Sequence, residues 1–116
     1  MGSEQLKTRT QAYGLSIIKL VQTLPERSPA RIIGQQLMRS GTSVGANFRA
    51  ACRARSRPDF IAKLKIVEDE CDESIYWLEM LGKMQMGTDS IQPLIDEGNQ
   101  ILSVIVASIK TARRNS

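Results

Sequence analysis

The residues best suited to chemistry are acidic side chains in the second half of the chain. Glu70 and Glu73 are three positions apart, so on a helix they share one face, and Glu79 follows further along. Paired carboxylates can carry out acid–base chemistry or bind a metal ion. A di-iron site in a helical bundle also needs Glu-x-x-His pairs, and the sequence contains no His. The usual general base is therefore missing too, and we predict a protein that is not an enzyme and takes no cofactor.

Nucleophilic side chains are no better placed. Without His, no Ser-His or Cys-His arrangement can be drawn, and Gly41 and Gly45 are not followed by the Gly-Lys-Ser/Thr of a phosphate-binding loop. Cys52 and Cys71 lack the short spacing of a metal-binding pair. We interpret them as reduced cysteines that pack as small apolar side chains, with a redox or disulfide role as the alternative.

Basic residues offer a second kind of chemistry, the binding of phosphate groups. From Arg27 to Lys65 there are nine basic residues and one acid, Asp59, whereas residues 66–79 hold six acids and no base. Guanidinium groups match phosphate geometry, and such clusters bind nucleic-acid backbones in a salt-dependent way. Two solvated helix faces of opposite charge are the competing interpretation. The candidate nucleic-acid-binding residues, gathered around one expected turn, are Arg49, Arg53, Arg55, Arg57 and Lys63.

Composition limits the remaining possibilities. The 116 residues are enough for a single domain, 1–116, with one core, and the net charge of +4 suits an acidic partner. Aromatic residues make up only 4% of the chain, so RNA binding should depend on shape and backbone more than on base identity. No apolar run approaches the roughly 18 residues of a membrane span, and Met1-Gly2-Ser3 does not begin a signal peptide. We expect a cytoplasmic protein with no membrane contact.

Apolar spacing predicts two helices in the first half of the chain. The first covers residues 4–24 and stops at Pro25, because a residue before proline avoids the helical region. The second begins with Ser28 as N-cap and Pro29 at the first helical position, and runs to about Arg53. Their apolar stripes are Leu6, Tyr13, Ile17, Leu20 and Leu24 in the first, and Ile32, Ile33, Leu37, Met38, Val44 and Phe48 in the second.

Two more helices follow. A capping-box-like pair, Ser56 and Asp59, starts the third, which runs to about Met86 and is ended by Gly87. Thr88, Asp89 or Ser90 then caps the fourth. Their stripes are Phe60, Leu64, Val67, Cys71, Ser74, Leu78 and Leu81, and Ile91, Leu94, Gly98, Ile101, Ile105 and Ile109. Four long helices with short connections predict an all-α fold, an antiparallel up-and-down four-helix bundle.

Small residues inside the second helix call for a packing explanation. Gly41 and Gly45 each cost roughly 1 kcal/mol relative to Ala in a helix. Because they lie one turn apart, they form a flat strip on which we expect the long third helix to seat closely; a loop is the alternative. A carboxylate of the third helix could then reach Ser43 or Asn47. The residues predicted at this close contact are Gly41, Ser43, Gly45, Asn47, Glu70 and Glu73.

Residues 37–81 resemble a known bacterial family. The segments Leu37 to Asn47, Ser56 to Leu64 and Glu70 to Leu78 are similar, in order and spacing, to four-helix-bundle proteins encoded in intervening sequences of 23S ribosomal RNA. That family includes the accessory variability determinant of diversity-generating retroelements. The first and fourth helices fit in length and pattern only. Where relatives often place Glu three residues after the Asn, this chain has Ala50, which makes the local surface more basic.

The resemblance implies an antiparallel bundle that assembles into a homopentamer, and for the retroelement branch a basic barrel that binds RNA and a reverse transcriptase. Together with the clustered charge, it leads us to expect a non-catalytic oligomeric protein that binds RNA or an RNA–protein complex. The alternative is a helical scaffold or protein-interaction module with no nucleic-acid role, whose subunit contacts would use Ile18, Val21, Val104 and Val106.

Overall fold

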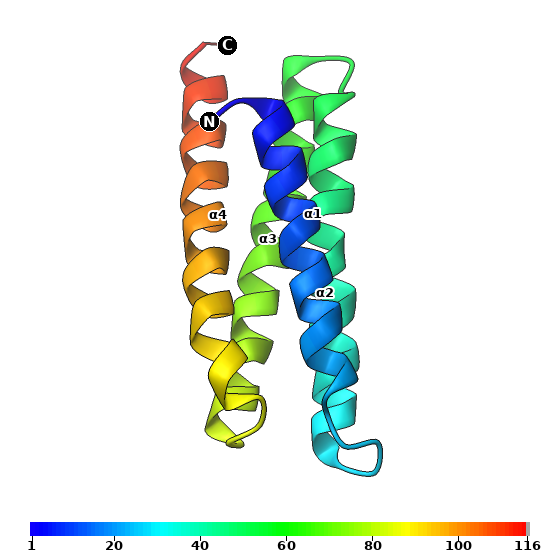
Figure 1. Ribbon diagram of the computed structural model, residues 1–116. Helices are drawn as coiled ribbons and strands as arrows, with labels where there is room; N and C mark the ends of the chain where they lie inside the picture. The colour runs from blue at the N-terminus through cyan, green and yellow to red at the C-terminus, as the bar shows by residue number, and fades with distance from the viewer. Residues whose placement is uncertain (116) are drawn as a thin grey trace.

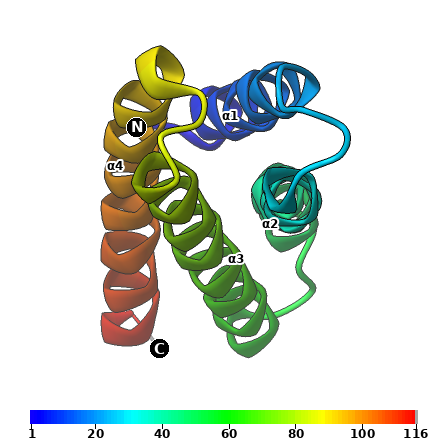
Figure 2. The same ribbon diagram turned by 90° about the horizontal axis from the view of Figure 1, so that it is seen from below.

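The computed structural model describes residues 1–115 and contains four antiparallel helices that follow one another around a common axis (Figure 1). Each helix packs against its neighbours in sequence, and α1 also reaches α4. The backbones of α2 and α4 stay apart over their described residues, on opposite sides of α3 (Figure 2). The predicted all-α four-helix bundle is confirmed. The helices are α1 (Ser3–Gln22), α2 (Pro29–Cys52), α3 (Arg57–Lys83) and α4 (Thr88–Arg114).

The residues predicted to start α2 and α3 lie at the expected positions, but only some of the predicted capping hydrogen bonds form. Ser28 precedes α2, yet its hydroxyl donates to the Pro25 carbonyl at 3.3 Å and does not cap the helix. At α3, the Ser56 hydroxyl accepts from the Asp59 backbone N–H at 3.2 Å. The Asp59 carboxylate turns to the Arg55 N–H, at 3.4 Å, so the capping box is completed one residue early.

The connection between α3 and α4 differs from the prediction. Helix α3 ends at Lys83, before Met86, because Gln85 and Gly87 have φ angles of 61° and 58°, in the left-handed region. Gly87 itself occupies the N-cap position of α4, so the cap is not Thr88, Asp89 or Ser90. A Cβ at Gly87 would also lie 2.5 Å from Cδ1 of Leu20, which explains why glycine suits this turn.

The core follows the predicted stripes of α1, α3 and α4. The α3 seam is buried from Leu64 to Leu81, with Phe60 half-buried at its start, and every predicted apolar position of α4 is buried. Helix α2 differs. Ile32 and Met38, expected in its stripe, are 65% and 37% exposed. Helix α2 buries a face made largely of small residues, and Ile32 and Met38 lie outside that face. The small buried residues are Ala30, Gly34, Ser40, Gly41 and Ala51.

The glycine strip of α2 is helical, as predicted, but it faces α1 and not α3. A Cβ at Gly41 would overlap Cδ1 of Ile17, and one at Gly45 would lie 3.3 Å from backbone atoms of Thr10 and Gln11. Gly14 of α1 completes this contact, since its Cβ would lie 3.4 Å from the Cα of Thr42. The expectation that the strip seats on the third helix is therefore wrong. Periodicity identified a flat face but not the helix that covers it.

A buried hydrogen-bond chain joins α1 and α3 at the centre of the bundle. The Ser74 hydroxyl donates to the Cys71 carbonyl at 2.7 Å, so the Tyr13 hydroxyl, 2.8 Å away, donates to Ser74 Oγ. Burial raises the pKa of Tyr13, which keeps the phenol protonated. A Cβ at Gly98 of α4 would lie 2.8 Å from that hydroxyl and 2.9 Å from Ile75, so α4 leaves room for the chain of bonds.

Candidate nucleic-acid interface

The structure brings the predicted basic residues to one end of the bundle. Arg49 lies in the last turn of α2, Arg53 is its C-cap, Arg55 lies in the turn and Arg57 is the first residue of α3 (Figure 1). All four are exposed. Cations that lie close to one turn raise the positive potential at that end of the molecule, where salt-dependent binding of phosphate is favoured. We call this surface, with Lys63, the basic end.

Lys63 differs from the four arginines because it has a partner. Its ammonium donates to the Asp59 carboxylate at 2.6 Å across one turn of α3. This bond, together with the Arg55 N–H, lowers the pKa of Asp59. Lys63 is half-buried. It contributes to the basic end less freely than the exposed arginines do.

Helix α4 also brings cations to this end of the bundle, which was not predicted from the sequence. Arg113 and Arg114 lie in the last turn of α4, with Lys110 one turn earlier. Because the bundle has an even number of antiparallel helices, α4 ends where the α2–α3 turn lies (Figure 1). Thr111, Ala112 and Asn115 share a groove with residues of that turn. The predicted topology contained the signal, because in an antiparallel four-helix bundle the fourth helix ends at the same end as the turn between the second and third.

The carboxylates predicted at the glycine strip have a different partner. Glu70 accepts from Arg39 of α2 at 3.2 Å, and Glu73 accepts from the same guanidinium and from the Trp77 indole N–H at 2.9 Å. The indole bond and the Arg39 guanidinium lower the pKa of Glu73. These ion pairs join α3 to α2 and offset the positive charge of Arg39.

The polar residues of the strip bond within their own helix. The Ser43 hydroxyl donates to the Arg39 carbonyl at 2.7 Å, and the Asn47 amide donates to the Ser43 carbonyl at 2.9 Å. The suggestion that a carboxylate of α3 reaches these side chains is therefore wrong. The physical reason is the long Arg39 side chain, which reaches Glu70 and Glu73 first.

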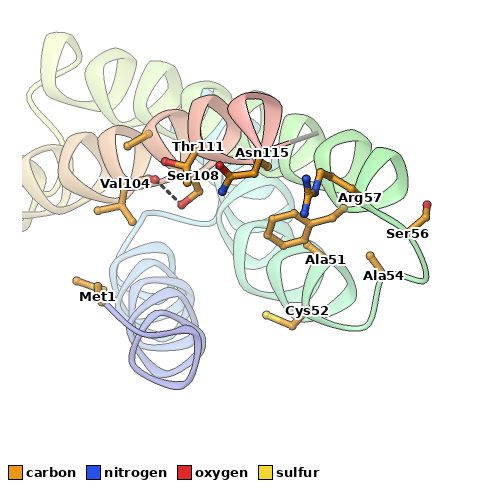
Figure 3. Close-up of a pocket in the computed structure, with 13 residues that line it drawn as sticks. Met1, Ala51, Cys52, Ala54, Ser56, Arg57, Val104, Ser108, Thr111 and Asn115 are labelled. Atoms are coloured by element: carbon orange, nitrogen blue, oxygen red, sulfur yellow. Dashed lines mark hydrogen bonds between the residues drawn. The ribbon is translucent and has the colours of Figure 1, made fainter.

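A groove of about 840 Å³ opens beside the basic end (Figure 3). It lies where the end of α2, the start of α3, the end of α4 and Met1 approach one another. Small side chains form much of its wall, including Ala51, Ala54 and Ala107, and Phe60 is its aromatic residue. Arg57 and Asn115 reach into the same space from α3 and α4 (Figure 3).

The two cysteines are free and lie in different surroundings. Cys52 is half-buried in the wall of the groove, and burial raises the pKa of its thiol. Cys71 is buried, and burial raises its pKa to about 12, with Sγ 3.3 Å from the Gly98 carbonyl. Both thiols are protonated at neutral pH, as expected for apolar packing. Within residues 1–115, no group of three or more His, Cys, Asp or Glu residues could hold a metal ion.

The fold and this sequence match a known family. The family model of the 23S rRNA-intervening sequence protein matches residues 4–107. This chain belongs to the 23S rRNA-intervening sequence protein family. The resemblance found over residues 37–81 is thereby confirmed and extended over α1 and most of α4.

A solved structure supports the assignment. A protein of unknown function from the S23 ribosomal protein family of Bacteroides thetaiotaomicron is 32% identical to this intervening-sequence protein, with a TM-score of 0.86. The match covers 95% of this chain and 99% of that one. A comparison with curated proteins finds none that matches. Over the described residues, no helix is long and apolar enough to cross a membrane.

Proposed function

We propose that this protein binds RNA, alone or in an RNA–protein complex, through the basic end and without catalysis. The observation that carries the proposal is the placement of four exposed arginines around one turn, with the cations of α4 beside them. Guanidinium groups suit phosphate oxygens, and the nearby acid Asp59 already accepts hydrogen bonds from the Lys63 ammonium and the Arg55 backbone N–H. On the retroelement branch of the family, the protein partner would be a reverse transcriptase.

Electrophoretic shift of structured RNA at low and moderate salt tests this proposal. The charge-reversal pair R53E/R57E should weaken binding by about tenfold or more and lower the salt dependence, with a log–log slope smaller by roughly 1.5. The matched control is R27E/R31E, because both arginines are exposed at the opposite end of the bundle. Absence of a shift by the unaltered protein at low salt, or equal effects of the two pairs, would refute the proposal.

A protein-interaction scaffold is the second candidate. Large apolar side chains are exposed on α1, α2 and α3: Leu15 is 54% exposed, Ile32 65%, Ile66 46% and Tyr76 52%. Such side chains are common in surfaces that bind other subunits. They favour a homo-oligomer, which we propose in both cases, with the pentamer that the family resemblance implies as its size.

Sedimentation and RNA binding separate the two candidates when they are measured on the same variants. Ile32→Ser and Tyr76→Ser should reduce the mass in solution if these surfaces join subunits. A scaffold should keep its partners in the R53E/R57E variant, whereas an RNA-binding protein should lose its ligand and keep its mass.

A further inference from the structure

The groove beside the basic end combines features that phosphate binding alone does not require. It lies where α2 and α4 stay apart, and their ends and the start of α3 border an open space of about 840 Å³. That volume lies within the range of about 300–1,000 Å³ typical of small-molecule sites. A groove of this size can hold more than a phosphate group.

The walls of the groove are chemically mixed. Phe60 is half-buried and supplies an aromatic ring, while the short side chains of Ala51 and Ala107 leave the space open. On the α4 side, the Ser108 hydroxyl donates to the Val104 carbonyl at 2.8 Å, which leaves its oxygen free to accept (Figure 3). Thr111 adds a further hydroxyl to the same wall.

The lining of the groove also includes a charged side chain, Arg57. Arg57 is exposed, and Arg53 and Arg55 are exposed residues of the connection between α2 and α3. Asn115 reaches in from α4 with an amide that can both donate and accept (Figure 3). A groove lined by an aromatic ring, hydroxyls, an amide and a guanidinium matches a ligand that has a flat polar ring and a phosphate.

We propose that the groove receives an unpaired nucleotide of the RNA, with its base against Phe60 and its phosphates on Arg57 and the neighbouring arginines. This inference rests on the proposed function and names its ligand class. Proteins recognise single-stranded RNA by stacking bases on aromatic rings and bonding their exposed edges, whereas bases inside a duplex are not accessible in this way. The protein therefore selects loops, bulges or ends over continuous duplex.

A peptide is a weaker match to the same groove. The carboxylates of an acidic amphipathic helix would pair with Arg57 and the neighbouring arginines. Its apolar face, however, would cover the hydroxyl of Thr111 and the amide of Asn115 without bonding them, and buried polar groups that lose water without a replacement are costly. A nucleobase, in contrast, has hydrogen-bond donors and acceptors along its edge that can bond to these polar groups.

Binding of two RNA probes of equal length, one single-stranded and one a blunt duplex, tests the assignment on the full chain. We expect the single strand to bind more tightly. Phe60→Leu keeps the apolar volume and removes the ring, and it should weaken single-strand binding by roughly 5- to 100-fold while leaving duplex binding within about twofold. Ala107→Leu, at an exposed position of the groove wall, should have the same selective effect by filling the space.

Ala12→Leu is the matched control, because Ala12 is an exposed alanine of α1 away from this groove, and it should bind both probes normally. Suppose that Phe60→Leu and Ala107→Leu both keep single-strand affinity while R53E/R57E loses it. The groove assignment would then be wrong, the proposed RNA binding would stand, and an acidic peptide would become the better ligand class. If the unaltered protein binds neither probe at low salt, the proposed function itself fails.

Discussion

The centre of the bundle and its basic end are made by the same helices but are held in different ways. At the centre, α1 packs on the glycines of α2, and the hydroxyls of Tyr13 and Ser74 bond to each other out of contact with water. At the basic end, the ends of α2 and α4 border an open groove, and Arg53 and Arg57 are exposed. Stability should therefore depend on the first region and binding on the second.

The largest effect should come from enlarging Gly45. A side chain there meets the backbone of α1 at Thr10 and Gln11, and a helix backbone cannot move aside as a side chain can. We expect Gly45→Val to cost about 3 kcal/mol and to lower Tm by about 10 °C or more. The neighbouring Ala46→Val is the control, since Ala46 is exposed and should change Tm little. Thermal unfolding followed by circular dichroism measures both, and similar Tm values would argue against the close α1–α2 contact.

The buried hydroxyl pair should give the next largest effect. Ser74→Ala leaves the Tyr13 hydroxyl, in a side chain only 2% exposed, without its acceptor. We expect a loss of about 2 kcal/mol in urea unfolding. The double variant with Tyr13→Phe should lose less than Ser74→Ala alone, because it removes the unpaired group. Additive losses would show that the two hydroxyls are not coupled.

A smaller effect concerns pH. The pKa of Glu73 is lowered by the Trp77 N–H and the Arg39 guanidinium, so its ordinary value of 4.5 applies only to the unfolded chain. Its contribution to stability is therefore complete above that value and is lost as the pH falls through the folded-state pKa. Because the group is partly exposed, we expect less than about 1 kcal/mol.

Urea unfolding at neutral pH and below pH ~4 tests this, since Glu73→Gln should lose less stability on acidification than the unaltered protein does. Glu79→Gln, an exposed change on the same helix, is the control. An unchanged acid dependence in Glu73→Gln would contradict the role of this carboxylate.

The smallest effect on stability should come from the basic end. Both side chains changed in R53E/R57E are exposed, so the free energy of unfolding should shift by no more than about 0.5 kcal/mol. The same variant is expected to show the largest change in RNA binding. If it unfolds easily, the arginines contribute to the fold, and the contrast between the two regions is wrong.

The sequence predicted the elements well and their partners less well. The seam from Leu64 to Leu81 and the start of α3 at Ser56 followed from local spacing. The direction of the glycine strip did not, because periodicity along one helix does not identify which neighbour covers a face. The exposed Ile32 shows a related limit. An apolar stripe along a helix can be wider than the face that neighbouring helices cover.

The candidate site was predicted as far as it lay on one continuous segment. Arg49 to Lys63 are close in sequence, so their proximity needed only one turn. Predicting the groove and the α4 cations required knowing which segments about fifty residues apart pack together. Counting charges along the chain does not give this information. Phe60 was assigned to the core seam, and the structure shows that it is half-buried there and also lines the open groove.

The antiparallel order of the helices has a practical consequence for experiments. Met1 and the end of α4 both lie beside the basic end, whereas the turns after α1 and α3 lie at the far end (Figure 1). An affinity tag or fluorescent domain fused at either terminus would emerge over the arginines and screen them. Labels for binding measurements are better attached in the turn that contains Glu26 and Arg27, about the whole length of the molecule away.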